Sequence, residues 1–577
     1  MDDATTTWCI AQQLSSEVRE LASALRMPPL VARVLINRGL RDEGAAGRYL
    51  RPMPGHLESP FAFRQMNLAV NRILGALQRN EKILVQGDYD VDGSASAALL
   101  VNLFRMLGAQ AEASIPVRAV DGYGLNVRVV REAAQKGVKL LITCDNGTTA
   151  VREVSLAREL GIDTIITDHH TVPPELPPAY ALLNPHVAEE TLAFRDLCGA
   201  GVAFKLALGI LERAGGGRID AAAREFLHSA QSLVALAAIA DVVPLRGENR
   251  VFARFGLGLM PDSANPGIRA LMEVASLTRV PTGTDVGFKL APRLNAGGRM
   301  GRETLALEIL TAPSYGEAMK LVQECDVLNR KRQQLDRELT KLASDIVRSD
   351  SSYEGERVLV VGHEDFQPGV VGIVAARLTE TFNKPAVLVA FNGDNGRGSG
   401  RSVPGFHLYN ALNECAHLMK RFGGHEQAAG LEITRENFGV LRRAVNEVAD
   451  KHVLNANYAS PTLDLDAEVS LSELTLEAVD TLALLEPFGE GNPEPQFCAR
   501  SVEVVAAPKV VGRGTGHLSL LLRQGGGPAL RAIGFGLAAL AENVQRGDRL
   551  RIAFSPIVND FRGARSVEVS LKAIRPE

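Results

Sequence analysis

Three short apolar runs that each end in acidic residues limit the possible folds of this chain more than any other feature. Residues 83–85, 139–144 and 163–167 are predicted to be strands, and the stretches 126–136 and 151–160 have the pattern of helices. Strands that alternate with helices predict right-handed βαβ units and a parallel sheet. Because the carboxyl ends of parallel strands open onto one edge, the residues that follow these runs are expected to meet in space.

The residues at the predicted strand ends are of the kinds that bind hard divalent cations. They are, in chain order, Asp88, Asp90, Asp92, Asp145, Asp168, His169 and His170. Carboxylates held close together repel one another unless a cation lies between them, and Mg²⁺ and Mn²⁺ prefer oxygen ligands. The Asp88–Asp92 segment taken alone is equally typical of an Asx-rich turn. The convergence of three such ends at one sheet edge favours a metal site.

A fourth apolar run, residues 233–240, ends at Asp241. An aspartate in this position could simply cap the end of the run. If Asp241 lies in the same pocket as the residues at the strand ends, the pocket contains five aspartates and one or two histidines. Such a set of ligands suits two Mn²⁺ or Mg²⁺ ions. A two-ion centre holds the attacking and leaving oxygens of a phosphoryl displacement and supplies hydroxide near neutral pH.

Several motifs resemble those of a known superfamily of phosphoesterases. They are DYDVDG at 88–93, DNG at 145–147, DHH at 168–170, ADVVPL at 240–245 and RFGGHEQAAG at 421–430. The first four are similar to the DHH phosphoesterase motifs, in the same order, and the fifth to the GGHxxAAG motif of the associated DHHA1 domain. Two more segments, APRLNAGGR at 291–299 and LEPFGEGNP at 485–493, narrow the resemblance to the RecJ family of bacterial single-strand-specific 5′→3′ exonucleases. The resemblance runs from Pro28 to the C-terminus.

The resemblance implies roles for the residues of the predicted metal site. The metal ligands it implies are Asp90, Asp92, Asp145, His169 and Asp241, with Asp88 as a sixth candidate that could instead position its neighbours. Asp145 could bridge two ions, because its strand is expected to lie between the other two. The family pattern places His170 against the scissile phosphate and makes Asp168 the group that orients a histidine. Without the family context, adjacent histidines are more commonly solvent-exposed turn residues.

The resemblance also implies contacts with the phosphates of the substrate. The residues concerned are Arg118, Arg293, Ser399, Arg401, Gly423, Gly424 and His425. Bidentate arginines that bind a 5′-terminal phosphate would explain cleavage from that end, whereas Arg299 could be structural. The glycine-rich segment 396–402 is interpreted as a loop that cradles phosphate, although a plain flexible loop has the same composition. The sequence departs from the family at Gln367, where a Trp-His pair is usual; Phe366 keeps the aromatic ring, and His363 lies nearby.

The chain is too long for one core, and we expect a multidomain α/β protein. The expected order is a helical lead-in (1–60), a parallel-sheet DHH domain (61–310), a connecting helix (311–350), an α/β DHHA1 domain (351–455) and an all-β OB-fold domain (456–577). The apolar positions of Tyr315–Ser349 predict one long helix, which could serve as a connector or as a coiled-coil contact between two copies. OB barrels commonly hold single-stranded nucleic acid, as the resemblance implies here.

Composition places the chain among ordinary globular proteins of a reducing compartment. It is 46% apolar and 23% charged, and its six cysteines are scattered without paired spacing. No apolar stretch is long enough to span a membrane, and the N-terminus lacks the pattern of a signal peptide, so we expect a cytoplasmic, nucleoid-associated protein. The net charge is −4, but residues 500–577 carry twelve Lys and Arg against six Asp and Glu. That excess suits nucleic acid, although a solvated surface has the same composition.

The expected function is metal-dependent exonuclease activity. The enzyme would degrade single-stranded DNA from its 5′ end to mononucleotides during DNA repair and recombination, together with a helicase and a single-strand-binding protein. An alternative is a phosphodiesterase for short oligoribonucleotides or cyclic dinucleotides, for which a C-terminal OB domain would be superfluous. A non-catalytic scaffold is a third hypothesis, and the intact carboxylates of all four motifs argue against it.

Overall fold

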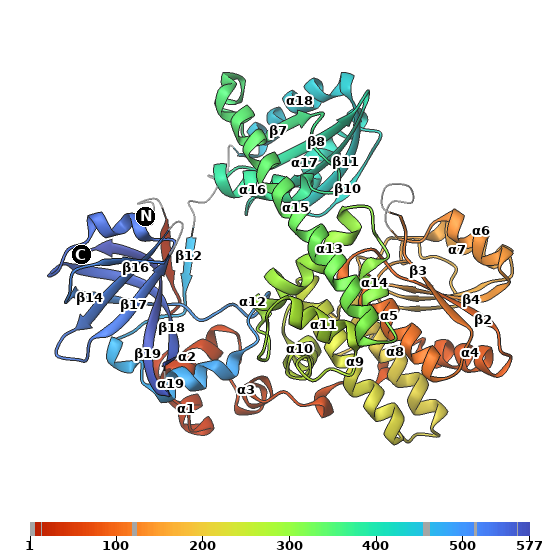
Figure 1. Ribbon diagram of the computed structural model, residues 1–577, viewed down its shortest axis with the longest axis horizontal. Helices are drawn as coiled ribbons and strands as arrows, with labels where there is room; N and C mark the ends of the chain where they lie inside the picture. Colours follow the sequence, from red (N-terminus) through yellow and green to blue (C-terminus); the bar gives the residue numbers. More distant parts are fainter. Residues whose placement is uncertain (1–5, 13, 118–123, 454–461, 513–515, 562) are drawn as a thin grey trace. The chain divides into compact units, whose positions relative to one another are not determined.

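The chain forms two compact units in a computed structural model that describes residues 6–12, 14–117, 124–453, 462–512, 516–561 and 563–577 (Figure 1). The first unit comprises Met1–Leu294, Ala306–Val322 and Thr462–Glu577, and the second comprises Asn295–Leu305 and Gln323–Pro461. The predicted long helix is present as α15 (Tyr315–Ser349), which begins in the first unit and ends in the second. Among the described residues, no helix is long and apolar enough to cross a membrane.

A five-stranded parallel sheet organises the predicted DHH region. Its order is β3-β2-β4-β5-β6, so the strand before Asp145 lies between those that precede the other two acidic ends, as predicted. The three central strands of the sheet are largely apolar runs because helices cover both faces. The strands of the sheet are β2 (Lys82–Gln86), β3 (Ala111–Ser114), β4 (Val138–Cys144), β5 (Asp163–Thr167) and β6 (Ala181–Leu183).

Helices pack on both faces of this sheet, as Figure 1 shows. One face is covered by α6 (Val127–Gln135) and α7 (Val151–Glu159), and the other by α4 (Met66–Gln78), α5 (Val91–Met106) and α8 (Gly199–Ala214). The apolar run before Asp241 is the end of a helix, α9, which packs against α5 and α8. The remaining helices are α9 (Ala221–Ala240), α10 (Gly247–Leu259), α11 (Pro266–Val274), α12 (Gly283–Asp285), the π-helix η3 (Val286–Leu290), α13 (Ala291–Arg299) and α14 (Leu305–Leu310).

The C-terminal strands close into a small barrel. The sheet order is β13-β14-β18-β19-β17-β16-β15, and an additional β14–β16 pairing joins five of these strands into a ring. A closed five-stranded barrel is the OB architecture predicted from the sequence. The strands are β13 (Ala467–Glu468), β14 (Phe497–Val504), β15 (Lys509–Val511), β16 (His517–Gln524), β17 (Leu530–Phe535), β18 (Arg549–Phe561) and β19 (Ala564–Pro576).

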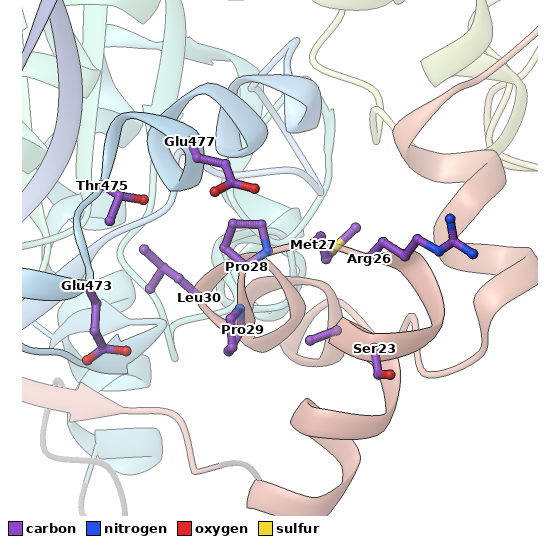
Figure 2. A pocket seen from close by; sticks show the side chains of 10 residues that line it. Ser23, Arg26, Met27, Pro28, Pro29, Leu30, Glu473, Thr475 and Glu477 are labelled. Atoms are coloured by element: carbon purple, nitrogen blue, oxygen red, sulfur yellow. The ribbon is translucent and has the colours of Figure 1, made fainter.

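The N-terminal segment packs against this barrel, although the two are far apart in sequence. The strand β1 (Thr7–Ile10) pairs in parallel with β12 (Thr462–Leu465). Apolar residues of α1 (Ser15–Leu25), α2 (Pro29–Asn37) and α3 (Glu43–Leu50) share one core with the barrel and with α19 (Leu476–Leu482). Figure 2 shows the groove of about 570 Å³ where the start of α2 meets the segment that leads into α19. The N-terminal segment therefore contains a strand as well as the predicted helices.

The second unit contains a mixed five-stranded sheet of order β10-β11-β9-β8-β7. Apolar residues of α15 and α16 cover one face, and those of α17 and α18 cover the other. The elements are β7 (Leu359–His363), α16 (Val371–Phe382), β8 (Ala386–Asn392), β9 (Asn395–Arg401), α17 (Leu408–Glu414), β10 (Arg421–Gly424), β11 (Ala428–Thr434) and α18 (Arg435–Val453).

The interpretation of the glycine-rich segment 396–402 as a loop is wrong. Residues Asn395–Arg401 form β9, which lies between β8 and β11 in the middle of the sheet. Its glycines share one face, where a Cβ on Gly396 would lie 2.6 Å from Val389 Cγ1 and a Cβ on Gly400 would lie 2.8 Å from Leu408 Cδ2. The glycines therefore allow close packing within the sheet rather than flexibility.

Candidate metal centre

The turn after β2 brings three aspartates into a small volume. Asp90 is the N-cap of α5 and accepts a hydrogen bond from Gly93 N at 2.9 Å, while Asp88 and Asp92 are buried. Only glycine fits at position 93, because a Cβ there would lie 2.3 Å from Asp88 N. The carboxylate of Asp92 accepts hydrogen bonds of 2.7 Å from Gly199 N and from Ala200 N, at the N-terminus of α8. A helix N-terminus stabilises such a negative charge.

Asp145 follows β4 in a strained backbone conformation. Its φ of 62° lies in the left-handed region, which a non-glycine residue seldom adopts. The side chain is buried, and its Oδ1 lies 3.0 Å from His169 Nε2. Gly199 of α8 packs directly against it, since a Cβ on Gly199 would lie 2.8 Å from Asp145 Cβ. Close packing thus fixes the position of this carboxylate.

The turn after β5 orients the two histidines differently. Asp168 accepts hydrogen bonds from Thr148 N at 2.9 Å and, through its Oδ1, makes one of 2.8 Å with His170 Nδ1. His169 instead turns toward the carboxylates, and its Nε2 lies 3.6 Å from Asp92 Oδ2 and 3.5 Å from Asp241 Oδ2. His169 is therefore within 3.6 Å of carboxylates from three different elements.

Two overlapping groups of these side chains have the geometry of a metal site. Asp145, His169 and His170 form one group, and Asp92, His169 and Asp241 form the other; within each group the ligand atoms lie within 4.8 Å of one another. Asp241 reaches the centre from the C-cap of α9, so a helix end contributes to the site together with the three strand ends.

The carboxyl groups repel one another strongly. Burial, followed by the charge of Asp90, raises the pKa of Asp92 to about 7. Burial, followed by the charge of Asp92, raises the pKa of Asp241 to about 8 and holds that of Asp145 well above its usual range.

Asp88 shares this environment, and burial followed by the charge of Asp90 raises its pKa well above the usual range. Its Oδ1 is buried, and no residue in the described part of the chain forms a hydrogen bond with it. A buried polar atom without a partner and a cluster of mutually repelling carboxylates both fit divalent cations, which supply the missing ligand contact and the compensating charge.

The two histidines have opposite protonation preferences. Burial, and then the charge of His170, lowers the pKa of His169 to about 4, so its imidazole is neutral at pH 7, as a metal ligand must be. Burial also disfavours the charged form of His170, but the hydrogen bond and charge of Asp168 outweigh it and raise the pKa to about 9. The same hydrogen bond, with that from Thr148, keeps the pKa of the buried Asp168 below its usual range.

Some residues of the centre were not identified from the sequence. Asn184 follows β6, is fully buried, and donates hydrogen bonds of 2.9 Å to His170 O and 3.0 Å to Thr148 Oγ1. The three-residue strand before it is too short to predict. The contact of Gly199 N and Ala200 N with Asp92, at the start of α8, was not predicted either. A Gly-Ala-Gly sequence at the start of a helix could have indicated that the backbone approaches a negatively charged group there.

The predicted phosphate contacts lie in several places. Arg118 falls outside the described residues. Arg293 lies on α13, half-buried, and donates a hydrogen bond of 2.6 Å to Lys289 O.

In the second unit, Ser399 and Arg401 lie on the face of β9 opposite its glycines, beside Gly372 at the start of α16. Gly423 and Gly424 end the edge strand β10, and His425 N donates a hydrogen bond of 2.8 Å to Ala428 O in the following turn. A Cβ on Gly424 would lie 2.3 Å from Ala428 O, so the tight hairpin requires this glycine.

The departure at Gln367 leaves the local fold intact. The carbonyl of Gln367 accepts hydrogen bonds from Val370 N at 2.9 Å and Val371 N at 3.1 Å at the start of α16. Phe366 is buried in the core, with its ring centroid 5.7 Å from that of His363. Its aromatic ring therefore contributes to packing.

Family models match three parts of the chain. Residues 82–237 match the DHH family, N-terminal domain, residues 355–451 match the DHHA1 domain, and residues 465–573 match the RecJ OB domain. The first match contains Asp88 through Asp168 and both histidines of the centre, whereas Asp241 lies just beyond it.

Relatives match the chain over nearly its full length. The single-stranded-DNA-specific exonuclease RecJ of Escherichia coli is 34% identical over 97% of this chain and 98% of its own. That of Dickeya dadantii is 34% identical over 95% of this chain and 96% of its own. The Mn²⁺ complex of RecJ from Thermus thermophilus has a similar structure, with a TM-score of 0.84 and 29% identity over all of this chain and 80% of that one. The chain therefore belongs to the RecJ family of exonucleases.

Proposed function

We propose that this protein is a two-metal-ion exonuclease that degrades single-stranded DNA in the 5′→3′ direction to mononucleotides. The observation that carries the proposal is the convergence of Asp92, Asp145, His169 and Asp241 on one point at the carboxyl edge of the parallel sheet. The relatives named as single-stranded-DNA-specific exonucleases support the choice of substrate. Repair and recombination of DNA are the processes that use such an activity.

The centre would hold two Mn²⁺ or Mg²⁺ ions. Asp92, Asp145, His169 and Asp241 are the proposed ligands, with Asp90 and Asp88 beside them. Asp145 would be the shared ligand, a role supported by the position of its strand between the other two. Bound there, the ions would lower the pKa of water and neutralise the charge that develops on the phosphate. The neighbouring RecJ structures with Mn²⁺ and with Mg²⁺ support this choice of cations.

His170 is the proposed proton donor and phosphate contact. Its Nδ1 is held by Asp168 at 2.8 Å, which leaves Nε2 as the ring nitrogen that can face the substrate. A pKa of about 9 keeps the imidazole protonated at neutral pH, so it can donate a hydrogen bond to the phosphate and a proton to the leaving oxygen. Asp168 acts through His170 and does not itself contact the substrate.

The OB barrel offers a surface suited to a single strand. Phe535 of β17 is 62% exposed, and its ring lies against His517 of β16 with centroids 5.1 Å apart. Arg531, on the same strand and also exposed, adds a cation, which lies 3.8 Å from the carboxylate of Glu568. Exposed aromatic rings with cations around them bind unpaired bases by stacking and the backbone by charge.

Further groups would contact the phosphates. We assign these contacts to Arg118, Arg293, Ser399, Arg401, Gly423, Gly424 and His425. Binding of a terminal 5′-phosphate by such groups would set the direction of degradation. The same proposal places the protein in the cytoplasm on the nucleoid, where a helicase would supply single strands and a single-strand-binding protein would hold them.

Substrate length tests this function against the hydrolysis of short oligonucleotides. The turnover of a dinucleotide is compared with that of a long single strand, with Mn²⁺ present in both reactions. We expect a much higher kcat/KM for the long strand, because the barrel binds only strands long enough to reach it. Preference for the dinucleotide would contradict the proposal.

A further inference from the structure

The motif at 485–493 has no part in the chemistry described above, yet it contacts the segment that carries Asp241. We call Leu485–Asn492 the clasp. Asn492 is fully buried and holds the clasp in shape, since its Nδ2 donates hydrogen bonds of 2.8 Å to Leu485 O and 2.7 Å to Pro487 O. Its Oδ1 accepts a hydrogen bond from Arg38, which follows α2. The clasp thus connects the barrel and the N-terminal helices.

The clasp is anchored to α10 by a buried arginine. Arg250 Nη1 donates a hydrogen bond of 2.9 Å to Leu485 O, and Nη2 donates to Leu484 O at 3.0 Å and Glu486 O at 3.1 Å. The guanidinium also lies 3.9 Å from the ring centroid of Tyr49. A single side chain that satisfies several carbonyls in this way fixes the clasp on the domain that carries the metal centre.

The clasp directly contacts the turn that follows Asp241. Leu245 N donates a hydrogen bond of 2.8 Å to Glu490 O, and Arg246 Nε donates one of 2.8 Å to Gly491 O. The two backbones are close: a Cβ on Gly489 would lie 2.8 Å from Leu245 Cδ1, and one on Gly491 would lie 3.0 Å from Pro244 Cβ. These contacts begin three residues after the aspartate.

The turn itself is strained. Val242, next to Asp241, has a φ of 60°, in the left-handed region that a β-branched residue avoids, and its side chain is 62% exposed. Such a conformation persists only where the surrounding structure imposes it. On the N-terminal side α9 imposes it, with Asp241 N bonded to Ala237 O at 2.9 Å. Val242 N and Val243 N also bond to Ile239 O and Ala238 O of α9, both at 3.3 Å, and the clasp contacts the turn directly after them, at Pro244 and Leu245.

We propose that the clasp is a positioning element for the metal centre, which holds the turn at Val242–Leu245 so that the Asp241 carboxylate stays beside Asp92 and His169. Arg246 and Gly491 are the positioning residues at the contact. This inference rests on the proposed role of Asp241 as a metal ligand. It makes one ligand of the centre depend on the docking of the C-terminal barrel.

A matched pair of glycine substitutions tests the proposal. Gly491→Ala places a methyl group against Pro244, whereas Gly525→Ala, in a barrel turn of similar φ (56° against 65°), meets nothing within 4 Å. Both substitutions carry the same kind of backbone strain, so their difference reports the contact with the turn. The full-length variants are titrated with Mn²⁺ and followed by electron paramagnetic resonance, and kcat and KM are measured on a 5′-phosphorylated single strand.

We expect Gly491→Ala to weaken the binding of one Mn²⁺ by about 10- to 100-fold, the effect of disturbing a group that orients a metal ligand. Its kcat should fall while KM stays unchanged, and Gly525→Ala should behave as wild type. Equal Mn²⁺ affinity in the two variants would overturn the proposal, whether both match wild type or both are weakened.

A second pair of variants, at Arg246, tests the proposal independently in case Gly491→Ala does not fold. Arg246 is exposed, so Arg246→Ala removes the hydrogen bond to Gly491 O, whereas Arg246→Gln keeps a donor nitrogen, Nε2, at the same position along the side chain. Weaker Mn²⁺ binding in Arg246→Ala with recovery in Arg246→Gln supports the positioning role, and no difference between them contradicts it. Because Mn²⁺ binding is measured without DNA, failure of the wild type to cleave single strands would contradict the proposed function and leave this test valid.

Discussion

At the scale of single residues, His169 is the point at which the centre is assembled. Its Nε2 lies within 3.6 Å of carboxylate oxygens from Asp92, Asp145 and Asp241, whereas His170, the next residue, pairs with Asp168 instead. The carboxylate of Asp168 is paired with His170 at 2.8 Å, although its charge still contributes, after burial and three other aspartates, to the raised pKa of Asp145. This division gives the two histidines different tasks.

Replacement of Asp145 tests whether this carboxylate serves cleavage rather than strand binding. We expect Asp145→Ala to reduce cleavage of a single strand to background and largely to spare strand binding, because it removes a carboxylate of the centre and no contact to the barrel. Cleavage is followed on a labelled strand, and binding by fluorescence anisotropy with Ca²⁺ in place of Mn²⁺. Equal loss of binding would show that the centre mainly holds substrate.

The raised carboxyl pKa values predict how pH affects stability. The pKa values of Asp92 and Asp241 are raised to about 7 and about 8, and that of His170 to about 9. The stabilisation from a raised pKa is present at low pH and is lost as pH rises through the folded value. The loss begins above the unfolded pKa, which is about 4 for the aspartates and about 6.5 for His170. With metal removed by a chelator, the melting temperature should therefore fall as pH rises from about 4 to about 9.

Mn²⁺ should abolish much of this fall, because the cation replaces the protons that relieve the repulsion among carboxylates. The measurement is thermal unfolding at several pH values with EDTA or with Mn²⁺. The same slope in both conditions would mean that the carboxylates are not at a cation site.

At the scale of elements, the site is made from the ends of three strands and one helix. The strand ends could be predicted, because apolar runs with acidic ends in a βαβ pattern must meet at one sheet edge. The order of β2, β4 and β5 was predicted correctly from the resemblance to the family, because a βαβ pattern alone does not set the order of the strands. The left-handed conformation of Asp145 could not be predicted, because the strand pattern does not reveal the close approach of Gly199 to this residue.

The glycine-rich strand β9 shows where local sequence is misleading. Glycines favour turns, but here tertiary packing outweighs that preference, because neighbouring strands and helices occupy the space a side chain would need. Conversely, Ala111–Ser114 carries only small and polar residues in an edge strand, so it has no local pattern that indicates a strand. Both cases depend on contacts distant in sequence.

The packing of β9 predicts a difference between two glycines of the same sheet. Gly396→Ala should lower the free energy of unfolding by about 1–3 kcal/mol, the cost of overpacking, because its methyl group would meet Val389 and Phe391. Gly430→Ala on β11 is the control, since its Cβ would meet only Gly398 O at 3.9 Å. Urea unfolding of both variants measures the difference; equal stabilities would contradict the close packing assigned to β9.

At the scale of the whole molecule, the first and last parts of the chain form one core. Leu35 of α2 and Phe497 of β14 belong to the same apolar cluster, and β1 pairs with β12. No local pattern predicts this association, because it joins residues more than 400 positions apart. A truncation after residue 460 would remove the apolar partner of α1–α3, so it would disturb folding as well as strand binding.

Single substitutions on the barrel therefore give a cleaner test of strand binding. Phe535→Ala should weaken binding of a long single strand by about 1–3 kcal/mol, the contribution of one stacked base. Because phenylalanine is uncharged, the dependence of affinity on salt should stay the same. Leu160→Ala, which removes an exposed apolar side chain at the end of α7, is the control. Equal affinity of the two variants would exclude Phe535 from the binding surface.

The most direct test of the central claim is the degradation of end-labelled DNA by the purified protein with Mn²⁺. Single and double strands, labelled at the 5′ or the 3′ end, are followed over time beside the Asp145→Ala variant. The account predicts that the 5′ label of a single strand is released at once as a mononucleotide, that the 3′-labelled strand shortens gradually, and that double strands and the variant show no reaction. An intact 5′-labelled single strand, or release of the 3′ label first, would contradict it.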